Sequence, residues 1–170
     1  MWSAEFEQKT YLELRDLAEA QFRRGPNVQQ TLQPTALVNE AYLRLAKWSG
    51  EYNDREHFLA TAATVMRQLL VDRARARGAL KRGGGQVQVE LSDLDLYESS
   101  CGDLVEFDEL LTLLEEQDAQ LARIVELRFF GGLTEQETAN SLDVSVSTVT
   151  RGFKVAKNWL KARLDEREEG

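Results

Sequence analysis

Apolar residues in the first half of the chain recur every three or four positions, which is the spacing of an amphipathic helix. This pattern predicts a helix that Ser3 caps and a second helix that starts near Pro34, a residue suited to a first helical turn. A third helix is expected from about residue 56 to residue 77 or beyond, with Asp54 as its cap. A Gly-Pro pair at residues 25–26 separates the first two helices.

Glycines interrupt the helical pattern in the middle of the chain. Three successive glycines at residues 83–85 end the third helix, because each glycine costs ~1 kcal/mol inside a helix. An acidic stretch follows, with a short extended piece at residues 87–91. Two further helices are then predicted, from about residue 104 to 115 and from residue 118 to 130, where a glycine pair closes the second of them.

The periodicity as a whole predicts an all-α fold with two small helical domains, residues 1–82 and 103–170, joined by an acidic linker at residues 83–102. The chain has 29 Asp and Glu against 21 Lys and Arg, a formal charge of −8. Residues 90–126 hold twelve carboxylates and one base, Arg123, so this window carries −11 and the rest of the chain +3. Because salt screens charges beyond ~8–10 Å, basic clusters elsewhere can still attract a polyanion.

The stretch TANSLDVSVSTVTRGFK, residues 138–154, is typical of a helix-turn-helix. Thr134 and Glu137 fit a capping box for its first helix, and Ser145 is suited to cap the second. The second helix carries short polar and basic side chains that suit phosphates and base edges. These candidate DNA-binding residues are Ser147, Thr148, Thr150, Arg151, Lys154 and Lys157. An ordinary helical hairpin with a solvated basic face is the alternative.

Two residues depart from the usual helix-turn-helix pattern. Asp143 stands in the turn where glycine is common, although Asp tolerates a left-handed backbone moderately well. Gly152 lies inside the predicted recognition helix and is expected to weaken it.

The sequence lacks residues and motifs that several classes of protein require. Cys101 is the only cysteine and His57 the only histidine, which argues against a disulfide framework, a Cys- or His-based metal site and a His-based catalytic triad. No cofactor is expected. The start lacks the order of a secretion signal, and no run approaches the ~20 apolar residues of a membrane span. Since a phosphate-binding loop and a metal-ligand motif are also missing, an enzyme is disfavoured. The sequence predicts a soluble, cytoplasmic protein without a membrane partner.

Longer stretches carry a resemblance to a known family. LQPTALVNEAYLRLAKW (residues 32–48) and HFLATAATVMRQLLVDRARARGALKRGGG (57–85) resemble region 2 of bacterial sigma factors. LLEEQDAQLARIVELRFFGGLTEQETANSLDVSVSTVTRGFKVAKNWLKARL (113–164) resembles their region 4. The presence of these two regions alone is typical of the extracytoplasmic-function (ECF) class of the sigma-70 family. The resemblance implies a transcription initiation factor that binds core RNA polymerase and directs it to promoters.

The resemblance also implies which residues bind polymerase. The matching helix docks on the β′ clamp helices in the family, and region 4 meets the β flap. The polymerase-binding residues implied are Leu37, Val38, Glu40, Tyr42, Leu43 and Arg44. Family members commonly begin this helix with an acidic cluster, whereas here Gln-Pro-Thr-Ala stands at residues 33–36. Since an anion is favoured in a first helical turn, phosphorylation of Thr35, or less favourably Thr31, by a Ser/Thr kinase would restore the charge. The alternative is that Thr35 only starts the helix, and that docking depends on Leu37, Leu43 and their neighbours.

The basic third helix matches the part of region 2 that engages the minus-ten element. The residues implied are Arg67, Gln68, Arg73, Arg75 and Arg77. Four ring-bearing residues lie near this helix in the sequence: Trp48, Tyr52, His57 and Phe58. They either form a stacking surface for an unpaired base or pack in the core. Val65-Met66 stands where primary sigma factors have an aromatic pair, which favours melting of a short, specific element. The last helix is expected to read the minus-thirty-five element.

Other interpretations stay open at this point. The acidic linker is either a phosphate mimic within polymerase channels or a solvated spacer. Its carboxylates at residues 90–98 also suggest a segment that folds back on the basic surfaces when polymerase is absent. An anti-sigma partner is compatible with the sequence. The main alternative function is a dimeric helix-turn-helix regulator that binds DNA without polymerase, although no heptad pattern offers a dimer interface.

Overall fold

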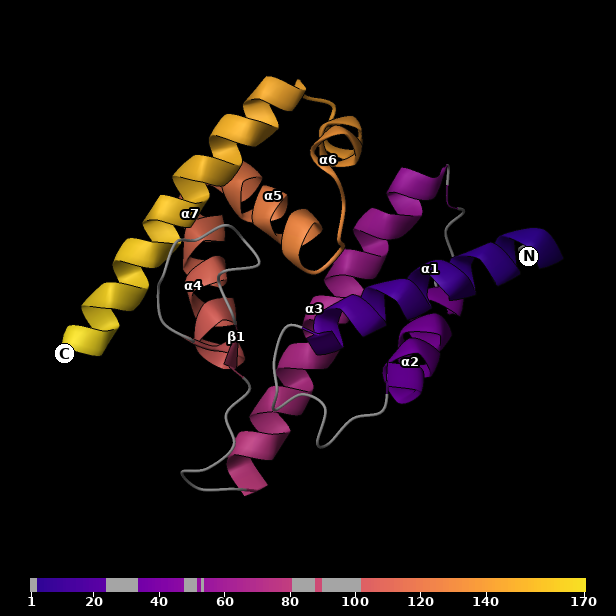
Figure 1. Ribbon diagram of the computed structural model, residues 1–170, viewed down its shortest axis with the longest axis horizontal. Helices are drawn as coiled ribbons and strands as arrows, with labels where there is room; N and C mark the ends of the chain where they lie inside the picture. The colour runs from indigo at the N-terminus through magenta and orange to yellow at the C-terminus, as the bar shows by residue number, and fades with distance from the viewer. Residues whose placement is uncertain (1–2, 24–33, 48–51, 53, 81–87, 90–101) are drawn as a thin grey trace.

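The structure, a computed structural model, describes residues 3–23, 34–47, 52, 54–80, 88–89 and 102–170 (Figure 1). The first helices are α1 (Ala4–Arg23), α2 (Pro34–Ala46) and α3 (Arg55–Leu80). They are followed by α4 (Leu104–Gln117), α5 (Ala119–Phe129), α6 (Glu135–Leu142) and α7 (Val146–Glu169). The short strands β1 (Gln88–Val89) and β2 (Gly102–Asp103) form one antiparallel pair. The predicted all-α fold is confirmed.

The predicted helix starts are found in the structure. The Phe6 N–H donates to Ser3 Oγ at 3.2 Å, and the His57 N–H donates to Asp54 Oδ1 at 2.7 Å. Each side chain satisfies a backbone donor that has no partner within its own helix. Pro34 is the first residue of α2, where its missing N–H costs nothing.

The helices form two groups, α1 to α3 and α4 to α7, and α3 lies at the boundary between them (Figure 1). On one side α2 packs against both α1 and α3. On the other side α4, α5 and α6 contact α3, while α7 crosses the outer faces of α4, α5 and α6. Helices that carry the two resembling regions are therefore in direct contact.

The buried apolar residues form one cluster that includes members of both groups. In the first group Leu37, Phe58 and Met66 have at most 1 % of their surface exposed. In the second, Phe107 packs against the rings of Phe129 and Phe130. Most of the predicted linker lies outside the described residues, so the proposed domain boundaries stay a prediction.

A glycine pair permits the loop after α5 to lie close to the first group of helices. A Cβ on Gly131 would stand 2.9 Å from Ala63 Cβ and 2.6 Å from the Leu127 carbonyl oxygen. Gly132 has a φ of 63°, a conformation that favours glycine, and its added Cβ would lie 3.2 Å from Leu17. The pair therefore turns the chain out of α5 and also allows this close approach. None of the described helices combines the length and the apolar character that crossing a membrane requires.

Candidate nucleic-acid interface

Helices α6 and α7 form the predicted helix-turn-helix, and both predicted caps are confirmed. Thr134 Oγ1 accepts from the Glu137 N–H at 3.1 Å, while Glu137 Oε2 accepts from the Thr134 N–H at 2.8 Å. Ser145 Oγ accepts from the Thr148 N–H at 3.1 Å and starts α7. These capping bonds fix where α6 and α7 begin, so the turn between the two helices has a defined length.

The turn uses a left-handed residue, as the sequence suggested. Asp143 has φ 54° and ψ 48°, and the following Val144 N–H donates to the Ala139 carbonyl oxygen at 3.0 Å. This six-to-one bond is the Schellman arrangement, which ends a helix and reverses the chain. Asp143 thus fills the position that glycine usually takes.

The apolar side of α7 packs against α5. Val149, Ala156 and Leu160 are fully buried. A Cβ on Gly152 would stand 2.8 Å from Ile124 Cδ1, so α7 approaches α5 closely at this point. The glycine that the sequence marked as a weak point of the helix has a packing role.

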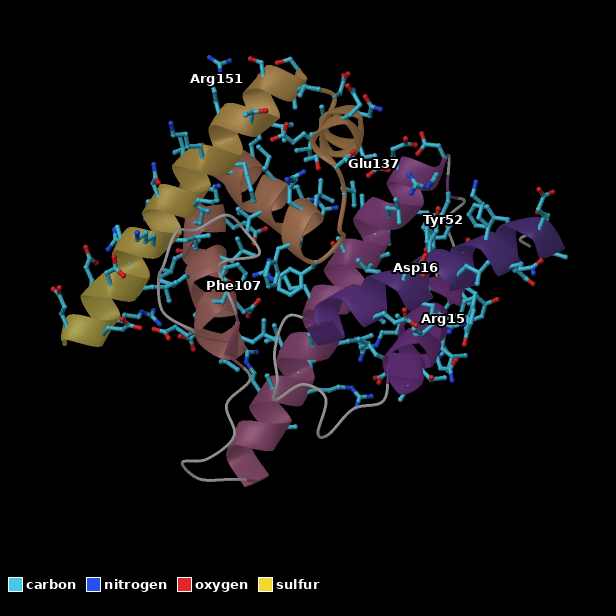
Figure 2. All side chains as sticks on the ribbon, in the orientation of Figure 1. Arg15, Asp16, Tyr52, Phe107, Glu137 and Arg151 are labelled. Atoms are coloured by element: carbon cyan, nitrogen blue, oxygen red, sulfur yellow. The ribbon has the colours of Figure 1, made fainter. Side chains whose placement is uncertain are left out.

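The opposite side of α7 is exposed and polar. Ser147, Thr150, Arg151 and Lys154 are all exposed, and their spacing places them along one face of the helix. Arg151 projects from the body of the protein near the turn (Figure 2). Its Nε donates to the Ser147 carbonyl oxygen at 3.3 Å, so one N–H of the guanidinium is used within the helix. Exposed hydroxyl groups and cations of this kind suit contacts with phosphates and base edges.

Two other residues predicted on this surface are partly engaged within α7. Thr148 is half-buried, and its hydroxyl lies 2.9 Å from the hydroxyl of Ser145. The Lys157 ammonium lies 5.1 Å from the centre of the Phe153 ring. Both therefore contribute to the cap or the packing of the helix as well as to its surface.

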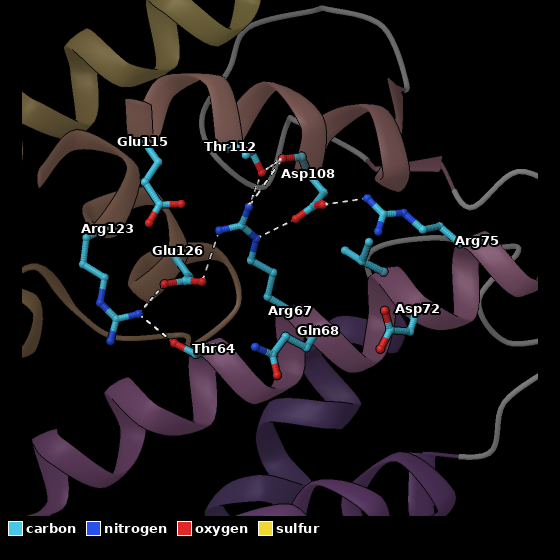
Figure 3. Close-up of a pocket in the computed structure, with 11 residues that line it drawn as sticks. Thr64, Arg67, Gln68, Asp72, Arg75, Asp108, Thr112, Glu115, Arg123 and Glu126 are labelled. Atoms are coloured by element: carbon cyan, nitrogen blue, oxygen red, sulfur yellow. Dashed lines mark hydrogen bonds and ion pairs between the residues drawn. The ribbon is translucent and has the colours of Figure 1, made fainter. Parts of the chain in front are cut away.

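The basic residues predicted on α3 lie in different environments. Gln68 is exposed, Arg73 pairs with Glu40 of α2 at 2.5 Å, and the side chain of Arg77 lies outside the described residues. Arg67 keeps only 13 % of its side-chain surface exposed. Its Nε donates to Asp108 Oδ1 at 2.6 Å (Figure 3), and Arg75 also reaches Asp108 at 3.3 Å. Carboxylates of the second helical group thus occupy part of the surface expected to meet DNA.

The residues predicted to bind polymerase divide between the core and the surface of α2. Leu37 and Val38 are buried, and the half-buried Tyr42 packs edge-on against the ring of Tyr11. Leu43 keeps 59 % of its surface exposed although it is a large apolar residue. Near it on the helix, Glu40 and Arg44 form an ion pair at 3.5 Å. The predicted polymerase-binding residues that reach the surface are therefore Leu43, Glu40 and Arg44.

The aromatic residues near α3 are mainly part of the packing. Phe58 is only 1 % exposed and contacts the ring of Tyr52 edge-on. The Tyr52 hydroxyl donates to the Leu45 carbonyl oxygen at 3.3 Å, and partial burial raises the pKa of this phenol. His57 lies beside this cluster, with its ring centre 5.5 Å from that of Tyr52. Core packing is the favoured interpretation for Phe58, and Trp48 lies outside the described residues.

An arginine and a carboxylate outside the predicted site join the two helical groups. Arg55 Nη1 donates to Glu137 Oε1 at 2.6 Å, and Arg55 Nε donates to Glu13 Oε1 at 2.6 Å. Partial burial acts to raise the pKa of Glu137, but the bonds from Arg55 and Thr134 outweigh it and lower that pKa. The same pairing raises the pKa of Arg55. The capping-box pattern marks Glu137, but no local pattern marks its pairing with Arg55, because the two residues are distant along the chain.

No group of three His, Cys, Asp or Glu side chains that could hold a metal ion occurs among the residues that the structure describes. A search of curated proteins gave no match, and neither did a search of solved structures. A family model described as "ECF sigma factor" matches residues 3–166, which is nearly the whole chain. The matched span includes the helix-turn-helix, α2 and α3. The chain therefore belongs to the ECF sigma factor family, whose members act in transcription initiation.

Proposed function

We propose that this protein binds core RNA polymerase and directs it to promoters through three surfaces on different helices. The observation that carries the proposal is the exposed polar face of α7, held by a capped helix-turn-helix in a chain of this family. Short hydroxyl side chains beside cations suit both phosphate contacts and hydrogen bonds to base edges.

The three surfaces have separate tasks in this proposal. Ser147, Thr150, Arg151 and Lys154 on α7 read the minus-thirty-five element in the major groove. The basic residues of α3 engage the minus-ten element, for which unpairing a base costs a few kcal/mol. Leu43 and its neighbours on α2 dock on the β′ clamp helices, and the second helical group meets the β flap.

Run-off transcription with purified core polymerase on a genomic DNA library tests this function. The protein is expected to give discrete transcripts that core polymerase alone does not give, and their start sites report the promoter motif. Tight, specific DNA binding by a dimer of the protein, without transcripts in the presence of core polymerase, would instead support a helix-turn-helix regulator.

Leu43→Glu is expected to lower the affinity for core polymerase at least tenfold, which is about 1.4 kcal/mol. Leu43 is 59 % exposed, so the variant loses an apolar contact and gains a charge at the interface without a cost to the core. Leu12→Glu makes the same change on α1, at a leucine that is 49 % exposed. A labelled-protein titration against core polymerase measures both, and equal losses for the two variants would contradict the assignment to α2.

Phosphorylation of Thr35 is expected to strengthen polymerase binding, with Thr35→Asp as a partial mimic. Thr35 is exposed in the first turn of α2, where no acidic residue is present. A phosphate adds about −1.5 to −2 charges at a position where the helix dipole favours an anion. Polymerase affinity is compared for kinase-treated protein, Thr35→Asp, Thr35→Ala and Thr31→Asp. Equally tight binding by all forms and by the unmodified protein would refute a switch at this residue.

A further inference from the structure

We propose that Val155 on α7 contacts the C5-methyl group of a thymine in the minus-thirty-five element and so selects that base. The contact rests on the proposed function of α7, and it adds an apolar, specificity-determining residue to the polar and basic residues of its exposed face.

Val155 is an exposed apolar residue on a polar surface. Four large apolar side chains are exposed in the part of the chain that the structure describes, and Val155, with 55 % of its surface exposed, is the one on α7. A β-branched side chain is less favourable than alanine on a helix surface, because the helix restricts its χ1 rotamer. Since Val155 also buries little surface in the free protein, it adds little to the stability of the fold.

The position of Val155 places it next to the predicted DNA contacts. It follows Arg151 by four residues, so the two side chains lie about 40° apart around the helix and one turn from each other along it. Thr150 and Lys154 lie on the other side of Arg151. The exposed face therefore has a polar, cationic edge and an apolar edge. Both begin in the N-terminal part of α7, which in a recognition helix reaches the base edges.

The next large apolar residue along this edge is already engaged within the protein. Trp159, four residues after Val155, is half-buried and packs against the core cluster. The centre of its ring lies 5.2 Å from Arg163 Cζ. Val155 is thus a single large apolar group among polar side chains, which is too small for the apolar centre of a protein interface. A base that offers one methyl group matches its size.

The major groove offers such a group at each thymine. Every base pair presents hydrogen-bond donors and acceptors there, and thymine alone adds a methyl group at C5. The hydroxyl groups and cations of α7 can bond phosphates and polar base edges, but they gain nothing from a methyl group. Valine has two methyl groups and no hydrogen-bonding atom, so it favours thymine over a base whose polar edge it would leave without a partner.

The test first removes the methyl group from the DNA. Holoenzyme reconstituted from core polymerase and the full-length protein is titrated against promoter duplexes. In these, each thymine of the minus-thirty-five element, on either strand, is replaced in turn by deoxyuridine, which has the hydrogen-bonding groups of thymine but no methyl group. One of the replacements is expected to lower the affinity of the wild-type holoenzyme about fourfold, as the loss of one buried methyl group does.

The matching change in the protein is Val155→Ala. This variant is expected to bind the thymine-containing duplex more weakly by a similar factor, and to bind the duplex with deoxyuridine at that position equally well. Val155→Ile keeps an apolar contact and is expected to keep the preference for thymine. Leu12→Ala, which shortens an exposed leucine on α1, is the matched control and is expected to show the full preference. Circular dichroism verifies that the three variants are folded.

The two losses must depend on each other. If no deoxyuridine replacement lowers the affinity of the wild-type holoenzyme, or if the same replacement costs Val155→Ala as much as the wild type, the contact with a thymine methyl group is overturned. Equal losses on both duplexes, together with weaker binding of Val155→Ala to core polymerase, would also overturn it and would assign Val155 to polymerase. Failure of the proposed function is distinguishable, because the wild-type holoenzyme then gives no specific transcripts, whereas failure of this inference leaves transcription and the effect of Arg151→Ala intact.

Discussion

Arg151→Ala and Lys154→Ala are each expected to weaken promoter binding by about 1–3 kcal/mol, while the protein stays folded. Both side chains are exposed on the polar face of α7, and neither contributes to the packing against α5. The loss for a residue that contacts a base depends on the sequence of the minus-thirty-five element. A residue that contacts only phosphate lowers affinity about equally for all sequences and reduces the salt dependence.

The measurement titrates reconstituted polymerase holoenzyme against duplex DNA with native and altered minus-thirty-five elements at several salt concentrations. Arg15→Ala is the matched control, because Arg15 is an exposed arginine on α1 (Figure 2) and pairs with Glu19 of the same helix. The control is expected to bind like the wild type. Unchanged affinity and transcription in both α7 variants would remove this helix face from the promoter interface.

Gly131→Ala is expected to lower the free energy of unfolding by about 1–3 kcal/mol, as overpacking of a well-filled core does. The new Cβ would stand 2.6 Å from a backbone oxygen, that of Leu127, and 2.9 Å from Ala63 Cβ on α3. A backbone atom cannot move aside as the end of a flexible side chain can. The loop after α5 must therefore shift, which also loosens its contact with α3.

Urea unfolding followed by circular dichroism measures this loss, and Gly152→Ala is the comparison. There the new Cβ would meet Ile124 Cδ1 at 2.8 Å, the flexible end of a side chain, and the helix gains up to ~1 kcal/mol of propensity. The two effects oppose each other, so a small net change is expected. A Gly131→Ala protein as stable as the wild type would contradict the close packing around Gly131.

The sequence alone determined the helices, their starts and the helix-turn-helix. Ser3, Asp54, Thr134 and Ser145 were predictable as caps because each bonds a backbone N–H only three residues away. The exposed face of α7 was predictable for the same reason, since helical periodicity fixes which residues share a face. The family followed from longer stretches of the same local pattern, and the family match confirms it.

Only the tertiary structure decided which of the candidate residues are accessible. Arg67 looked like a free cation in a basic helix, but Asp108 and Glu126, 41 and 59 positions away, enclose it. Leu37 is buried and Leu43 exposed on one helix because α1 and α3 cover a single side of α2. Gly131 is required by a neighbour on another helix. Such contacts join residues far apart along the chain, and their pairing depends on how whole helices pack, which no local spacing encodes.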